Sequence, residues 1–95
     1  MSAVIDTAVV QLSEKLQGGF DGLAKFVIEG EGAIMLDAGG ARAADEEADV
    51  TMTATTEVFK AILDGEMNPT MAFMSGKLKI DGSMGQAMKL AAVLS

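Results

Sequence analysis

The chain has 95 residues, no cysteine, no histidine and a formal net charge of −7 at pH 7. Without these two residue types it can form no disulfide, and it lacks the usual zinc ligands and the commonest general base of enzymes. The acidic balance disfavours non-specific binding to nucleic acid or to an anionic membrane surface, both of which attract Lys and Arg. Because 49% of the residues are hydrophobic, we expect a single domain, residues 1–95, around one small core.

The N-terminal segment MSAVIDTAVVQLSEKL has no basic region and contains Asp6 and Glu14, which is atypical of a secretory signal. No apolar run approaches the ~20 residues that span a bilayer. The C-terminal VLS differs from the SKL-type peroxisomal address. We therefore expect a cytoplasmic protein.

The first predicted element is an amphipathic helix over residues 3–17. Ile5, Val9, Leu12 and Leu16 recur on one helical face, which Ala8 extends. The pair Gly18-Gly19 is typical of a helix end.

Four strands are predicted next, because the apolar period changes to two residues. They lie in LAKFVIEG, GAIMLDA, the polar segment ARAADEE and ADVTMTAT. The glycines of Gly30-Glu31-Gly32 and Gly39-Gly40 favour tight hairpin turns. The alternation places Met35 on the wetter face of its strand, and ARAADEE is expected at or near a sheet edge.

Helical spacing returns at Thr56, where Val58, Phe59, Ile62 and Leu63 share a face. A short helix follows from Pro69 to Ser75, with Asn68 as its N-cap, and KLKID is predicted to be a fifth strand with Leu78 and Ile80 inward. A last helix is predicted after a capping box formed by Ser83 and Gln86. Its expected apolar face consists of Met84, Ala87, Met88, Ala91 and Leu94.

The predicted order is therefore αββββααβα, an α/β fold of the α+β type. Consecutive hairpins favour a mainly antiparallel five-stranded sheet. One face of each strand is more apolar, so we expect helices on one face of the sheet and solvent on the other.

No catalytic or metal-binding pattern stands out. No G-x-S-x-G motif surrounds a serine, and the acidic run Asp45, Glu46, Glu47 and Asp49 lacks the spacing and the glycine of a calcium loop. Gly30-Glu31-Gly32 lacks the third glycine and the following helix of a dinucleotide-binding motif. We expect no enzymatic activity, no metal and no cofactor.

Five of the eight methionines lie between Glu66 and Leu90: Met67, Met71, Met74, Met84 and Met88. Methionines at helical spacing most often fill a core. Their flexible side chains also suit apolar binding sites, particularly beside small residues such as Ala72 and Gly85. Composition alone favours core packing and leaves a binding site open.

The C-terminal half resembles the sterol carrier protein two family, the non-specific lipid-transfer domain. The matching pieces are the ADVT strand, TEVFKAILDG, the MNP turn with the following AF, GKLKI, the Gly82 turn and MGQAMKL. The resemblance implies an apolar tunnel between the sheet and the helices that binds lipids without chemistry. The lipid-binding residues it implies are Ile34, Leu36, Val50, Met52, Phe59, Met71, Phe73, Met74, Leu78, Ile80, Met84 and Met88.

The expected function is to bind, and to transfer or present, a fatty acid, fatty acyl-CoA, phospholipid or isoprenoid, or a sterol if the host has one. The C-terminal tail and targeting tripeptide of peroxisomal members are missing after Ser95, which implies a shorter or more open tunnel in a stand-alone bacterial protein. The alternative is an accessory protein of lipid or isoprenoid-quinone metabolism with a reduced or filled tunnel and a protein partner. For both functions we expect a monomer or weak dimer, at most transient contact with membranes and no binding of nucleic acid.

Overall fold

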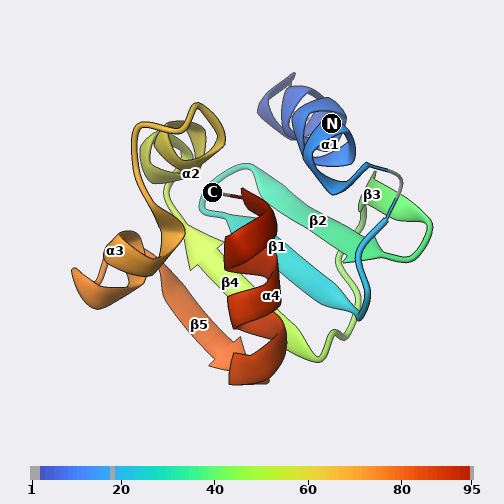
Figure 1. The fold of residues 1–95 in the computed structure, drawn as a ribbon. Coiled ribbons are helices and arrows are strands. Elements are labelled where there is room, and N and C mark those ends of the chain that lie inside the picture. Colours follow the sequence, from blue (N-terminus) through green and yellow to red (C-terminus); the bar gives the residue numbers. More distant parts are fainter. Residues whose placement is uncertain (1–2, 18, 95) are drawn as a thin grey trace.

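The computed structural model describes residues 3–17 and 19–94. Their helices and strands are α1 (Ala3–Leu16), β1 (Ala24–Ile28), β2 (Gly32–Asp37), β3 (Gly40–Ala43), β4 (Val50–Ala54), α2 (Thr56–Leu63), α3 (Pro69–Met74), β5 (Lys79–Gly82) and α4 (Met84–Leu94), as Figure 1 shows. The predicted order αββββααβα is confirmed. Gly18, expected to help end α1, lies outside the described residues.

The strands form one mixed sheet in the order β3-β2-β1-β4-β5. Three neighbouring pairs are antiparallel, and β1 pairs with β4 in parallel. Parallel neighbours require a crossover, and residues 44–49, here called the crossover segment, connect the edge strand β3 to β4. The mainly antiparallel sheet and the edge position of the third strand are as predicted.

The helices pack on one face of this sheet (Figure 1). α1 lies over β2 and β3, whereas α4 lies over β4 and β5. The strand positions that face the helices alternate as predicted, and Phe26, Ile34 and Met52 are fully buried there. Phe26 meets Phe59 of α2 edge to face, with ring centroids 4.4 Å apart, a favoured aromatic geometry. No helix among the described residues is long and apolar enough to cross a membrane.

The opposite face of the sheet is partly covered by the crossover segment. Lys25 and Arg42 flank Met35 in the strand register, and their nitrogens lie 2.9 Å from Asp45 and 2.8 Å from Glu46. Met35 is fully buried. Met35 therefore lies on the predicted face of the sheet, but the expected wetter surroundings are wrong, because its two neighbours are long cations tied to the crossover segment, and their apolar stems help to shield it.

Gln86 connects α4 to the loops that precede β1 and β4. Its backbone N–H donates to Ser83 Oγ at 3.3 Å, which is one half of the predicted capping box. Its side chain does not complete the box. Instead, Oε1 accepts from the Leu23 N–H at 3.1 Å and Nε2 donates to Asp49 at 3.2 Å. The start of α4 is thereby held beside the sheet.

Gly82 should be intolerant of a side chain, because its φ is +103° and a Cβ would lie 2.3 Å from the Asp49 carbonyl oxygen. We expect Gly82→Ala to lower the free energy of unfolding by roughly 2–4 kcal/mol, measured by urea denaturation. Gly76 has a φ of +80° with open space around its Cβ position, so Gly76→Ala should cost only about 1–2 kcal/mol. If both variants lost the same free energy of unfolding, the close approach of the Gly82 backbone to Asp49 could not be the cause of the loss.

Candidate functional site

An apolar groove of about 240 Å³ lies between α3, β5 and α4. Its lining residues are Met52, Pro69, Thr70, Phe73, Met74, Leu78, Ile80, Met84, Ala87, Met88 and Ala91. Thr70 is the single polar side chain in this lining, and none of the lining residues is ionisable. The groove can therefore hold an apolar molecule, but it offers no group for acid–base or nucleophilic chemistry.

The short helix α3 supplies one wall. Asn68 caps it by accepting hydrogen bonds from the backbone N–H groups of Thr70 and Met71 at 2.8 and 3.3 Å, and Pro69 occupies its first helical position. Only Pro69 and Ala72 of this helix are buried. A helix that buries two small side chains must leave the larger ones outside, and Met74 is accordingly 75% exposed.

The helix α4 supplies the facing wall, but it packs differently from the prediction. Ala87, Leu90 and Leu94 are buried against the rest of the fold, whereas Met84 and Met88 are 47% and 70% exposed. The expected apolar face omitted Leu90 and included both methionines. The helix is rotated relative to that expectation because Leu90 takes the inward position. The two methionines then lie beside the row of buried residues and at the groove.

Most of the predicted lipid-binding residues come together in this groove: Met52, Phe73, Met74, Leu78, Ile80, Met84 and Met88. Sequence reasoning missed Pro69, Thr70, Ala87 and Ala91 as lining residues. Ala87 and Ala91 could have been found, because they follow Met84 and Met88 by three residues on the same helix and small side chains leave space for a ligand.

Five predicted residues lie elsewhere. Ile34, Leu36 and Val50 are completely buried in the core and do not line the groove. Phe59 of α2 packs against Phe26 and lines a pocket beside α1, and Met71 points outward from α3 with 63% exposure. The first three are displaced from the expected lining because side chains from α1, α2 and α4 fill the space over the centre of the sheet. The apolar groove that the structure forms lies at the β5 edge and is open to solvent.

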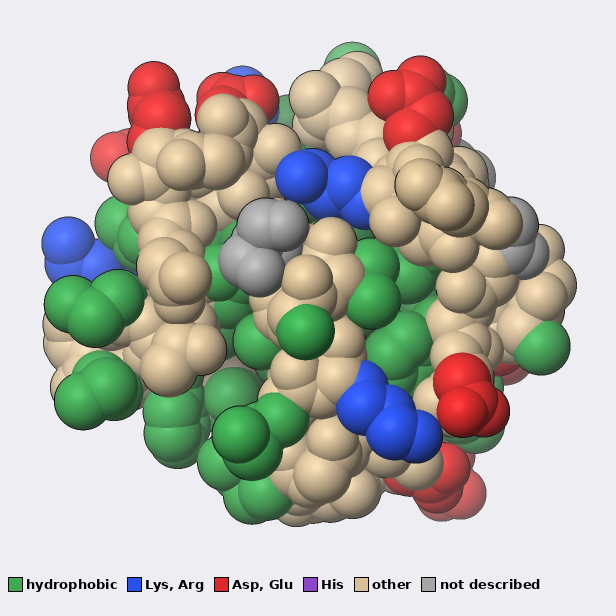
Figure 2. Space-filling view, viewed as in Figure 1, with side chains coloured by type: hydrophobic (Ala, Val, Ile, Leu, Met, Phe, Trp, Pro, Cys, Tyr) green, Lys and Arg blue, Asp and Glu red, His purple; other side chains and the backbone are tan. Residues whose placement is uncertain are grey.

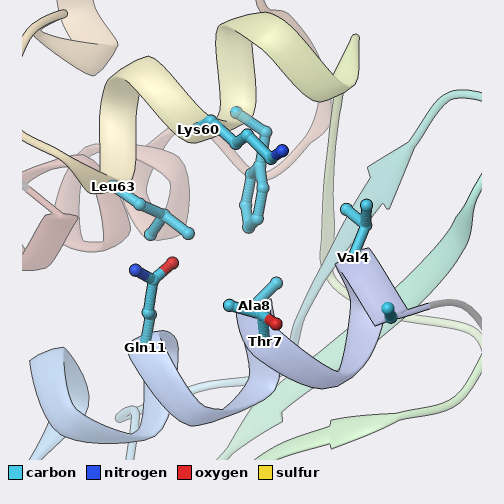
Figure 3. A pocket seen from close by; sticks show the side chains of 8 residues that line it. Val4, Thr7, Ala8, Gln11, Lys60 and Leu63 are labelled. Carbon is cyan, nitrogen blue, oxygen red and sulfur yellow. The ribbon is translucent and has the colours of Figure 1, made fainter.

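A second pocket, of about 220 Å³, lies between α1 and α2. Figure 3 shows Lys60 and Leu63 of α2 on one side and Thr7, Ala8 and Gln11 of α1 on the other. Its lining mixes an amine, an amide and a hydroxyl with apolar groups. The groove beside α3 therefore suits an apolar chain better, because it buries almost no polar groups that would lose their hydration.

Charged groups with perturbed titration lie at the opposite sheet edge. The hydrogen bond from Arg42, aided by the backbone N–H of Gly39, lowers the pKa of Asp37 below its ordinary value. Both side chains belong to β2 and β3 and neither lines the groove. Among the described residues, no group of three or more His, Cys, Asp or Glu side chains could hold a metal ion.

The positions of Met88 and Leu90 predict contrasting effects on stability. Leu90→Ala removes a fully buried side chain and should lower the free energy of unfolding by about 2–5 kcal/mol. Met88→Ala, two positions earlier on the same helix, should cost less than about 1 kcal/mol because most of that side chain is exposed. Chemical denaturation of both variants measures the difference. A loss for Met88→Ala as large as that for Leu90→Ala would make Met88 a core residue.

Comparisons with known proteins agree with this architecture. A solved sterol carrier protein domain from Helicoverpa armigera is 27% identical, covers 96% of this chain and 85% of its own, and superposes with a TM-score of 0.74. Sterol carrier protein 2 from Aedes aegypti, solved in complex with the C16 fatty acid palmitate, has a TM-score of 0.78 at 20% identity, with coverage of 100% and 97% of the two chains. At that identity, the second likeness shows the fold alone.

A curated relative, hydroxysteroid dehydrogenase-like protein 2 from Xenopus laevis, is 38% identical over 91 residues. The match covers 87% of this chain and 22% of that protein, so the chain spans less than a quarter of the relative. The model of the SCP-2 sterol transfer family matches residues 7–95. Because this match covers nearly the whole sequence, the chain belongs to the SCP-2 sterol transfer family.

Proposed function

We propose that the chain binds a lipid by its hydrocarbon part in the groove between α3, β5 and α4, and transfers or presents it to another site. The observation that carries this proposal is the groove lining, in which Thr70 is the single polar residue. Family membership and the palmitate complex of the Aedes aegypti relative support the same class of ligand.

The groove volume sets how much of a ligand it can take up. At about 240 Å³ it is slightly smaller than the ~300–1,000 Å³ typical of small-molecule sites. It would therefore take up part of a long hydrocarbon chain, and each methylene removed from water contributes about 0.8 kcal/mol. Met74, Met84 and Met88 are flexible and exposed at the groove, so they can rearrange around a longer segment.

The lining also suggests which part of the ligand is recognised. It has no cation that could bind a carboxylate or a phosphate, and Thr70 is its one side-chain hydrogen-bonding group. A fatty acid, an acyl-CoA, a phospholipid and an isoprenoid would then all bind by their apolar parts, with the polar head in water. Discrimination among them would be weak, since one methylene in an apolar pocket changes the binding free energy by only ~1–3 kcal/mol.

A second candidate function is that of an accessory protein in lipid or isoprenoid-quinone metabolism with a reduced site. The buried positions of Ile34, Leu36 and Val50 favour it, because the space over the centre of the sheet is filled. The two functions differ in one observable property. A lipid carrier takes up ligand saturably, whereas an accessory protein with a filled site does not.

Filling the groove with a larger side chain tests the proposal. Ala91 lines the groove on α4, whereas its neighbour Ala92 is exposed and does not. We expect Ala91→Phe to weaken the binding of a fluorescent fatty acid by at least about tenfold, which corresponds to losing about two buried methylenes. Ala92→Phe should bind like the unmodified protein. Fluorescence titration and circular dichroism of both variants measure binding and folding.

Two further outcomes distinguish the alternatives. If Ala91→Phe binds normally but Lys60→Gln weakens binding, the ligand occupies the pocket between α1 and α2 instead. If the unmodified protein shows no saturable binding, and native mass spectrometry finds no lipid on the purified protein, the accessory function is favoured and the carrier function fails.

A further inference from the structure

Oxidisable sulfur is concentrated on the exposed wall of the groove. Among the described methionines, only Met74, Met84 and Met88 both line the groove and are exposed, and we call these three the exposed groove methionines. Met71 is exposed but lies outside the lining, whereas Met52 lines the groove but is fully buried. Figure 2 shows hydrophobic side chains gathered on the surface where α3 and the lower part of α4 lie in Figure 1.

The composition leaves methionine as the main target of a mild oxidant. The sequence has no cysteine, tryptophan, tyrosine or histidine, so its most readily oxidised side-chain group is the thioether sulfur of methionine. This sulfur attacks one oxygen of hydrogen peroxide, the O–O bond breaks, and the products are methionine sulfoxide and water. The sulfur loses the two electrons that the peroxide gains. Because peroxide must reach the sulfur, exposed methionines react before fully buried ones.

We propose that the exposed groove methionines are a site of reversible oxidation by peroxides, and that their sulfoxides expel the bound lipid. This inference rests on the proposed binding of lipid in the groove. A sulfoxide oxygen accepts hydrogen bonds, and a hydrocarbon chain in the groove would separate it from water. Thr70 has the single side-chain donor of the lining, and its one hydroxyl hydrogen can serve only one of three sulfoxides. The others would lack a side-chain donor beneath the lipid, which weakens binding.

The fold itself should tolerate this oxidation. Without lipid, the exposed groove methionines lie in water, and their flexible side chains can keep a sulfoxide hydrated. The contacts that hold the two helices come from other residues, Ala72 on α3 and Ala87, Leu90 and Leu94 on α4. Methionine sulfoxide reductases, one for each sulfoxide epimer, restore the thioether. In that step a dithiol is oxidised to a disulfide and the sulfoxide oxygen leaves as water.

The first part of the test maps the oxidation. The protein is treated with hydrogen peroxide, digested, and analysed by mass spectrometry at successive times. We expect the exposed groove methionines and Met71 to be oxidised several-fold faster than Met52 and Met35, which are fully buried. Saturating palmitate, whose saturated chain does not react with peroxide, should slow oxidation several-fold at the exposed groove methionines. It should leave the rate at Met71 unchanged, because that side chain does not line the groove.

The second part measures how oxidation changes lipid affinity. Titration with a fluorescent fatty acid should give a Kd at least about tenfold higher after oxidation, and treatment with both reductases and dithiothreitol should reverse the rise. Circular dichroism should show the fold intact. Each variant is compared with itself before and after peroxide, so its own starting affinity cancels. A variant that combines Met74→Leu, Met84→Leu and Met88→Leu, side chains of similar volume that peroxide does not oxidise, should change less than about twofold. Met71→Leu should show the full loss.

The outcomes separate this inference from the proposed function. Saturable fatty acid binding that survives complete oxidation of the exposed groove methionines overturns the inference and leaves the proposed function standing. The inference is also overturned if the triple leucine variant loses affinity on oxidation as the unmodified protein does, or if palmitate protects Met71 as strongly as the exposed groove methionines. If the unmodified protein shows no saturable binding before oxidation, the proposed function fails, and lipid release by oxidation fails with it.

Discussion

The packing of α4 against the sheet determines the character of the groove. Ala87, Leu90 and Leu94 are buried, and the side chain of Gln86 fixes the start of the helix through hydrogen bonds to Leu23 and Asp49. With this rotation, Met84 and Met88 cannot join the core and lie instead at the groove. If the helix turned to bury them, the fully buried Leu90 would leave the core, with a cost of several kcal/mol. Met84 and Met88 are therefore exposed because α4 buries Leu90 in their place.

The β5 side of the molecule combines an apolar groove with exposed apolar side chains. The short α3 and the exposed surface of α4 provide adaptable apolar side chains, Met74, Met84 and Met88 among them. On the other side, Asp37, Asp45 and Glu46 pair with Lys25 and Arg42 and hold the crossover segment against the sheet. The acidic side chains thus contribute to the structure of one half of the molecule, while the apolar groove lies in the other half.

The order of elements could be predicted because local patterns determine it. The alternation of Val50, Met52 and Ala54, the Asn68-Pro69 helix start and the glycine turns are each readable within a few residues. The rotation of α4 could not be predicted, because a stripe through Met84, Met88 and Ala91 is as apolar as one through Ala87, Leu90 and Leu94. Only packing against β4 and β5 decides between them. The burial of Met35 could not be predicted for a similar reason, since its cover depends on ion pairs with a distant segment. The groove was anticipated in part by resemblance, which identified its methionines but also assigned the core residues Ile34, Leu36 and Val50 to the site.

Nuclear magnetic resonance of the protein labelled at its methionine methyl groups, during titration with a fatty acid, tests the central claim most directly. The chain contains eight methionines, and those among the described residues include positions in the groove, at its border and on the far face of the sheet. Binding in the groove predicts saturable shifts for Met52, Met74, Met84 and Met88, and an unchanged signal for Met35, which lies on the opposite face of the sheet. Unchanged signals from the four groove methionines at saturating fatty acid would contradict the account.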